Sequence, residues 1–236
     1  MKSLICFFVI SLLSVNLIVA QKQDQRYLDF AVATGTGFSP ALSYNQLWAV
    51  GKNGKFKLGT GLRITAFFSS NQDYITAPAR LTSGQTGPQV LFSETFLSNL
   101  DTLTLSQSAV YYVNIPIHLQ YSFSKKLELG FNIDAIGVSL GPKQTGTFYT
   151  KETANLNKTS QTASPTGLNL LLVSDNDWGN LNSELYVRYW LNNKIGLRAG
   201  LSFQFSEYTT STTLTFDNDR FRSKQLLPMI AVSYQW

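Results

Sequence analysis

The stretch from Lys224 to Trp236 alternates between apolar and other side chains, and this pattern constrains the fold more than any other feature of the sequence. One face of the expected strand consists of Leu226, Ile230, Val232, Tyr234 and Trp236. The other face consists of Gln225, Met229, Ala231, Ser233 and Gln235. A period of two with one apolar face is typical of a half-buried strand. A tryptophan at a fraying chain end is unusual in a soluble domain, whereas a membrane interface gives its amphipathic ring a suitable place.

This stretch resembles the last strand of bacterial outer-membrane β-barrel proteins, which ends on an aromatic residue preceded by apolar residues at alternate positions. The resemblance implies that the barrel-assembly machinery binds this strand. The residues that match the pattern are Ile230, Val232, Tyr234 and Trp236.

The composition fits strands that have one face in lipid and one polar face. Charged residues make up 14% of the 236 residues, whereas about 25% is usual in soluble domains. Aromatic residues reach 13%, yet the mean hydropathy is only −0.03. Few charges, many aromatic residues and neutral hydropathy favour a single barrel domain over a helical membrane protein.

The first twenty residues have the pattern of a cleavable signal peptide. Lys2 precedes the apolar run from Leu4 to Leu13, and Ala20 precedes a polar run. A helical membrane anchor from Leu4 to Ala20 is the alternative interpretation. Cys6 is the sole cysteine and lies in this segment, so the mature chain, residues 21–236, is expected to form no disulfide.

Eight strands are expected, and their connections differ in length at the two ends. The expected strands cover residues 27–34, 40–50, 56–68, 108–123, 127–140, 180–191, 194–206 and 224–236. Short turns, one with the hairpin signal Asn53-Gly54, alternate with connections that include two long polar loops, 69–107 and 141–179. The alternation also changes parity near residues 135–137, which predicts a β-bulge.

These features predict an eight-stranded antiparallel up-and-down transmembrane β-barrel in the outer membrane of a Gram-negative cell. The short turns and both termini would be periplasmic, and the long loops would be external. A soluble sandwich or a lipocalin-like barrel is the alternative, with the apolar residues packed in the centre. No compact basic patch indicates a nucleic-acid partner, since the net charge of +5 is distributed along the chain.

Charged residues of both signs occupy the polar face of the strands. In a barrel of eight strands the interior is filled by side chains, and buried charges must be paired. We therefore expect a structural charge network in the barrel interior, with a narrow ion path as the alternative role. The residues assigned to this interior set are Arg63, Glu128, Asp134, Glu184, Arg188, Arg198 and His118.

The sequence offers little for catalysis. A lipid-A-modifying hydrolase would need a histidine beside a serine nucleophile, and His118 is the sole histidine. Ser122 shares its face but lies too far along the strand for direct proton transfer. Since no nucleophile-elbow or metal-ligand spacing is present, we expect no enzyme activity, no metal and no cofactor.

The mature chain as a whole resembles the small outer-membrane barrels, among them the OmpA membrane domain, OmpX and the PorT-like barrels of Bacteroidota. Three fragments resemble strands of the PorT-like group, namely Gly35–Phe38, Leu119–Ser122 and Gly130–Asp134. The resemblance implies contact with outer-membrane lipid and a structural or interaction role, with long loops contacting envelope proteins or a secretion complex. A porin-like narrow channel and a hydrolase are the alternative functions.

Overall fold

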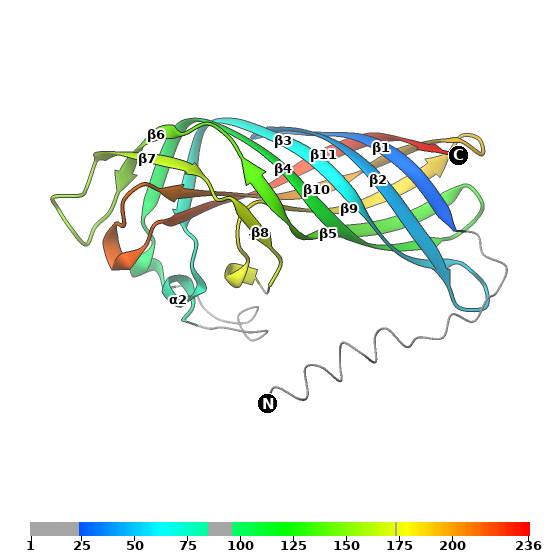
Figure 1. Cartoon of the computed structure of the whole chain (residues 1–236), viewed down its shortest axis with the longest axis horizontal. Helices are drawn as coiled ribbons and strands as arrows, with labels where there is room; N and C mark the ends of the chain where they lie inside the picture. Colours follow the sequence, from blue (N-terminus) through cyan, green and yellow to red (C-terminus); the bar gives the residue numbers. More distant parts are fainter. Residues whose placement is uncertain (1–23, 85–95, 173) are drawn as a thin grey trace.

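The computed structural model describes residues 24–84, 96–172 and 174–236, and these form an almost entirely antiparallel β structure (Figure 1). The predicted signal peptide, 1–20, lies outside the described residues. The long strands are β1 (Gln25–Thr34), β2 (Phe38–Val50), β3 (Phe56–Thr76), β4 (Thr102–Ser122), β5 (Leu127–Leu140), β9 (Leu181–Trp190), β10 (Ile195–Thr210) and β11 (Arg220–Gln235). The shorter elements are α2 (Ala79–Thr82), η2 (Leu97–Asn99), β6 (Gln144–Tyr149), β7 (Thr159–Pro165), β8 (Leu168–Leu170), η3 (Ser174–Asn176) and η4 (Thr215–Asp217).

The eight long strands close into a ring, which confirms the predicted barrel. Each pairs with the next in the order β1-β2-β3-β4-β5-β9-β10-β11, and β11 pairs back with β1, with Val232 opposite Phe30. The predicted β-bulge is also confirmed, because the β4–β5 register shifts between Ile115 and Pro116, where Ala135 is the extra residue. Among the described residues no helix reaches the length and apolarity of a membrane span.

One end of the barrel, here called the turn end, is closed by three tight turns at residues 51–55, 123–126 and 191–194. Gly54 has a φ of 58°, the left-handed conformation that the Asn53-Gly54 signal predicts. Strand β1 begins and β11 ends at the turn end (Figure 1).

The opposite end, here called the loop end, contains a second closed ring. Strands β6 and β7 pair with each other and bridge β4 to β10, while β11 pairs directly with β3 through Phe221 and Thr76. The order β3-β4-β6-β7-β10-β11 therefore closes a six-stranded barrel above the eight-stranded one. The prediction of irregular loops at 69–107 and 141–179 is wrong in this respect, since β3 and β4 continue into the first segment and β6, β7 and β8 lie in the second.

A local change in which face of the strand points inward explains why the alternation pattern does not predict this upper barrel. The buried, inward residues of β3 change from odd-numbered, such as Phe67, to even-numbered, such as Tyr74. The inward residues of β4 change in the same way between Leu105 and Val110. Asn71, with a φ of 49°, lies at the change and breaks the period of two.

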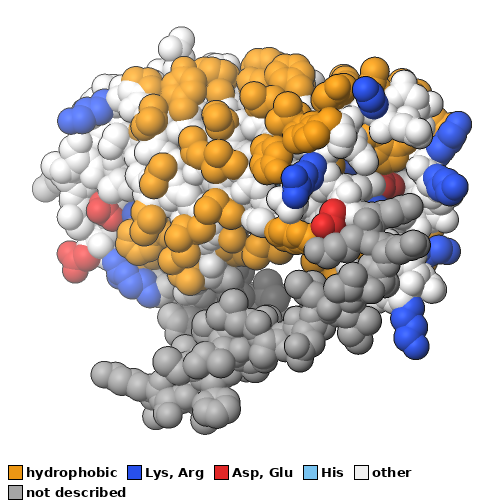
Figure 2. Space-filling model, turned by 45° about the vertical axis from the view of Figure 1, so that its right-hand side comes forward, with side chains coloured by type: hydrophobic (Ala, Val, Ile, Leu, Met, Phe, Trp, Pro, Cys, Tyr) orange, Lys and Arg blue, Asp and Glu red, His pale blue; other side chains and the backbone are white. Residues whose placement is uncertain are grey.

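The outer surface of the eight-stranded ring is a belt of apolar side chains (Figure 2). Phe30, Ile64 and Ile230 are 56%, 52% and 69% exposed. Along β4 and the first residue of the following turn, the belt runs from Tyr111 to Phe123, about 30 Å along the axis of a barrel with the usual strand tilt. This outward orientation contradicts the lipocalin-like alternative and matches the thickness of a bilayer core.

Aromatic pairs border the belt at both ends. At the turn end, Trp236 stacks on Tyr44 with 6.0 Å between ring centroids. At the loop end, the ring centroid of Phe68 lies 6.5 Å from that of Phe38 and 5.7 Å from that of Tyr111. Girdles of aromatic side chains at both edges of an apolar band are typical of transmembrane barrels.

Candidate functional site

The interior of the eight-stranded ring holds a continuous chain of ion pairs. Alternation turns every second residue inward, and barrel closure brings strands that are distant in sequence within contact distance. The chain joins seven side chains of alternating sign, in the order Glu128, Arg188, Asp29, Arg198, Glu184, Arg63 and Asp134. All seven are almost completely buried.

Arg188 lies in the half of this chain nearer the turn end. Its guanidinium group lies 3.3 Å from Glu128 and 3.3 Å from Asp29. The same group stacks over the Tyr27 ring, 4.0 Å from the centroid, and contacts the rings of Tyr186 and Trp190. Arg188 is thus fixed by two carboxylates and an aromatic enclosure.

Arg198 and Arg63 form the other half. Arg198 lies 2.9 Å from Asp29 and 3.0 Å from Glu184, and Arg63 lies 3.3 Å from Glu184. The chain ends at Asp134, 2.5 Å from Arg63. Each arginine therefore contacts two carboxylates, which compensate its buried charge.

Buried amides add further hydrogen bonds to the network. Asn132 donates to Glu184 at 2.8 Å, and Asn114 donates to Asp134 at 2.8 Å. The backbone N–H of Asn182 donates at 3.0 Å to the same Asp134 oxygen, Oδ2, that accepts from Asn114. At Asp134 these neutral groups satisfy the oxygen that Arg63 leaves free, whereas Asn132 shares Oε2 of Glu184 with the two arginines.

The sequence prediction omitted two members of the network. Asp29 contacts both Arg188 and Arg198, and Lys57 lies 3.5 Å from Glu128. With Lys57, the network contains four cationic and four anionic side chains. Both residues lie on the inward parity of their strands, and that signal could have identified them.

His118 lies inside the same ring but takes no part in its ion pairs. The structure places it between Gly59 of β3 and Asn132 of β5, and its side chain is 2% exposed. Neither ring nitrogen has a hydrogen-bond partner among the residues that the structure describes. Ser122 instead contacts Lys57 and Glu128. Within the described ranges no cluster of His, Cys, Asp and Glu could hold a metal.

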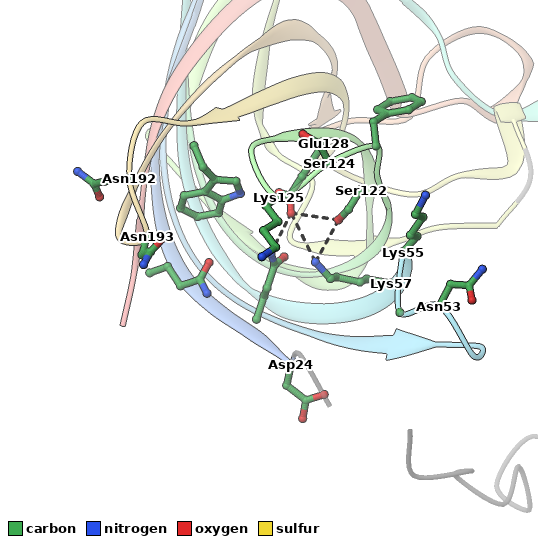
Figure 3. A pocket seen from close by; sticks show the side chains of 15 residues that line it. Asp24, Asn53, Lys55, Lys57, Ser122, Ser124, Lys125, Glu128, Asn192 and Asn193 are labelled. Atoms are coloured by element: carbon green, nitrogen blue, oxygen red, sulfur yellow. Dashed lines mark hydrogen bonds and ion pairs between the residues drawn. The ribbon is translucent and has the colours of Figure 1, made fainter. Parts of the chain in front are cut away.

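A vestibule of about 590 Å³ opens at the turn end of the interior (Figure 3). Lys55, Lys125 and Trp190 are among the residues that line it. Its floor is a hydrogen-bonded layer in which Gln25 donates to Glu128 at 2.8 Å and Lys57 donates to Ser122 at 3.1 Å. The vestibule therefore ends on the charge network.

The six-stranded ring above has a different, apolar filling. Tyr74, Leu103, Phe148 and Phe221 are fully buried there, and the Phe148 and Phe221 rings meet edge to face at 5.8 Å. Tyr208 packs edge to face on Tyr74 at 5.1 Å. The interior thus changes from an ionic plug to a hydrophobic core toward the loop end.

On the outside of the upper ring, polar contacts hold the segment around η3 against β10 and β11. Glu207 is fully buried and pairs with Arg220 at 2.8 Å and Arg222 at 2.6 Å. Asp175 pairs with Lys224 at 2.5 Å. Burial opposes ionisation of Asp175, but the hydrogen bond and charge of Lys224 outweigh it and lower the pKa of this carboxyl.

Three solved structures are similar to this chain. Neisserial surface protein A (NspA) is 10% identical, with a TM-score of 0.38, and the match covers 90% of this chain and 96% of NspA. The Yersinia pestis outer membrane protein Ail is 7% identical, with a TM-score of 0.36 and coverage of 91% and 100%. A major outer membrane protein from Thermus thermophilus is 11% identical, with a TM-score of 0.38 and the same coverage. No protein-family model matches the chain, and no curated protein matches it in sequence.

The chain is a transmembrane β-barrel. This assignment follows from its own strand pairing and apolar belt. The interior of the barrel is filled, so its accessible polar surfaces are the vestibule, the turn-end rim and the loop-end structure.

Proposed function

We propose that the protein is a non-conducting, non-enzymatic outer-membrane barrel that holds a folded platform outside the lipid. The observation that supports this is the filled interior. Side chains that line an aqueous pore are accessible to water, whereas Arg188, Asn114 and Gln204 are each 0% exposed. The apolar core of the six-stranded ring is a second obstacle to ions.

The platform is the six-stranded ring together with α2, η2 and η3, and its proposed role is to contact an envelope protein. Strands β3 and β4 continue about 20 Å beyond the apolar belt, so this part is a rigid extension and not a set of separate loops. Phe96 and Leu97 are 49% and 79% exposed there. Large exposed apolar side chains outside the lipid belt favour a protein contact.

We infer the orientation from the same features. The turn end, where β1 begins and β11 ends, would face the periplasm, and the platform would face the exterior. The terminal strand with Ile230, Val232, Tyr234 and Trp236 presents its apolar face outward and would be the segment that the assembly machinery binds.

Planar-bilayer recording tests the non-conducting role. The purified barrel should give no stable open events, while a general porin reconstituted in the same lipid serves as the positive control. Reproducible conductance steps that require folded protein would refute the proposal and favour the narrow channel.

Site-specific photocrosslinking tests the platform. A photoreactive residue at Leu97 should crosslink to a defined envelope protein in intact cells, and the same residue at Asn53 in the β2–β3 turn is the control. Equal products from both sites, or none from Leu97, would contradict an interaction role for the platform.

A further inference from the structure

The outer surface of the barrel has a groove over β9, β10 and β11 that begins at the turn end. The part at the turn end has a volume of about 580 Å³ and is lined by two lysines, the β9–β10 turn and apolar side chains. Its lining includes Lys126, Lys194, Leu191, Ile195 and Tyr234. This part lies at the edge of the apolar belt, next to the aromatic girdle formed by Tyr234 and Trp236.

The groove continues into the belt. A second hollow of about 580 Å³ is lined by Leu197, Ala199 and Val232, among others. Strand register places the two hollows next to each other, because the outward residues Ile195 and Tyr234 of the first are followed along β10 and β11 by Leu197 and Val232 of the second. Ala199 is the smallest outward residue in this part of β10, and its missing side-chain volume deepens the groove.

The backbone holds both lysines at the head of the groove. The carbonyl of Lys126 accepts from the N–H of Trp190 at 2.8 Å, and the carbonyl of Lys194 accepts from the N–H of Gln235 at 2.7 Å. Asn192 fixes the intervening turn, because its Oδ1 accepts from the N–H of Lys194 at 2.8 Å. One lysine thus comes from the β4–β5 turn and the other from the β9–β10 turn.

The charge at this position is not balanced by the protein. Neither Lys126 nor Lys194 forms an ion pair with any residue that the structure describes. The three turns at residues 51–55, 123–126 and 191–194 contain five lysines and no acidic residue. Lys and Arg side chains gather toward this end of the molecule (Figure 2).

We propose that this groove is a binding site for one anionic phospholipid of the leaflet around the turn end. Lys126 and Lys194 contact the headgroup phosphate, the Tyr234 hydroxyl lies at the level of the ester groups, and an acyl chain lies along the groove over Ala199. Two unpaired cations at the polar edge of an apolar groove select a lipid with a net negative headgroup over a zwitterionic one. A partner transmembrane segment would fill the apolar part but would leave both lysines without a counter-charge.

Native mass spectrometry of the detergent-solubilised barrel tests the site with phosphatidylglycerol and phosphatidylethanolamine of identical acyl chains. The wild type should retain one phosphatidylglycerol in preference to phosphatidylethanolamine. The double variant K126Q/K194Q should lose this preference, with phosphatidylglycerol affinity reduced about tenfold or more. The variant Ala199→Leu fills the groove without changing charge and should weaken binding of both lipids.

The matched control is K52Q/K125Q, which removes two lysines from the same rim but from outside the groove. Migration of the folded, unboiled protein in gel electrophoresis shows that each variant is a closed barrel. Equal retention of the two lipids by the wild type would overturn the proposal. An equal loss in K52Q/K125Q and K126Q/K194Q would also overturn it, because it would assign the preference to general rim charge.

Discussion

Replacing Asp29 with asparagine should destabilise the barrel strongly, because one carboxylate oxygen of Asp29 serves two arginines. Oδ2 lies 3.3 Å from Arg188 and 2.9 Å from Arg198. Asparagine has nearly the same volume, so the substitution removes charge with little change in packing. Arg188 would keep Glu128, and Arg198 would keep Glu184, each as a single carboxylate partner.

The expected loss of unfolding free energy follows from the arginine charge that Asp29→Asn leaves partly unpaired. Removing one partner from a fully buried ion pair costs about 3–5 kcal/mol, since the remaining charge is left in a medium of low dielectric. Because each arginine keeps one partner, we expect about 3 kcal/mol of lost unfolding free energy. In the double variant D29N/R198M the loss should be smaller than the sum of the two single losses by about 1–2 kcal/mol, because the two residues interact directly.

Reversible urea unfolding in lipid vesicles, followed by tryptophan fluorescence, measures these differences. Asp73→Asn is the matched control, since Asp73 lies exposed on β3 and its carboxylate accepts a hydrogen bond from Thr104 without an ion pair to any described residue. This control should change stability by less than about 0.5 kcal/mol. If Asp29→Asn shifted stability no more than Asp73→Asn, the ion-pair chain would not be a stabilising plug.

Three further predictions concern the belt, the upper ring and the η3 contact. Trp236→Ala should remove about 1 kcal/mol of aromatic stacking on Tyr44 and slow folding into vesicles, which gel mobility follows over time; unchanged kinetics would contradict this role. Phe148→Ala should cost about 3–4 kcal/mol within the upper ring, so limited proteolysis should cut the loop end while the lower barrel stays intact. Because the pKa of Asp175 is lowered in the folded state, its ionised carboxylate stabilises the fold at pH values above 3.8, the ordinary pKa of this carboxyl. This contribution is lost as the pH falls below 3.8 and through the lowered pKa. Since the Lys224 side chain is 38% exposed, the contribution should stay below about 1 kcal/mol. Protease sensitivity measured from pH 7 to pH 3 tests this, because the part of its pH dependence that comes from Asp175 should be absent in Asp175→Asn.

The local alternation of side chains was sufficient to predict the strands that cross the lipid. In β4 and β11 the period of two is unbroken over the belt, because every outward position meets hydrocarbon and every inward position meets other side chains. The bulge at Ala135 was visible for the same reason, since a change of parity between two regular halves of one strand requires an inserted residue. Both features depend on neighbours along the chain alone.

The upper barrel could not be predicted in this way. Its strands β6 and β7 are short, its outer face lies beyond the lipid belt, and the face change at Asn71 interrupts the period of two in β3. Its closure depends on the pairing of Phe221 with Thr76, residues far apart in sequence. No local signal specifies that contact.

The sequence by itself determined which side chains face lipid and which face the interior, since alternation is a property of the extended backbone. Only the tertiary structure decided which interior charges pair, because the partners come from strands that barrel closure brings together. Asp29 illustrates this difference, as its inward position was evident from β1 alone, whereas its two arginines come from β9 and β10. The same closure aligns Lys126 and Lys194 above one groove, although they belong to different turns.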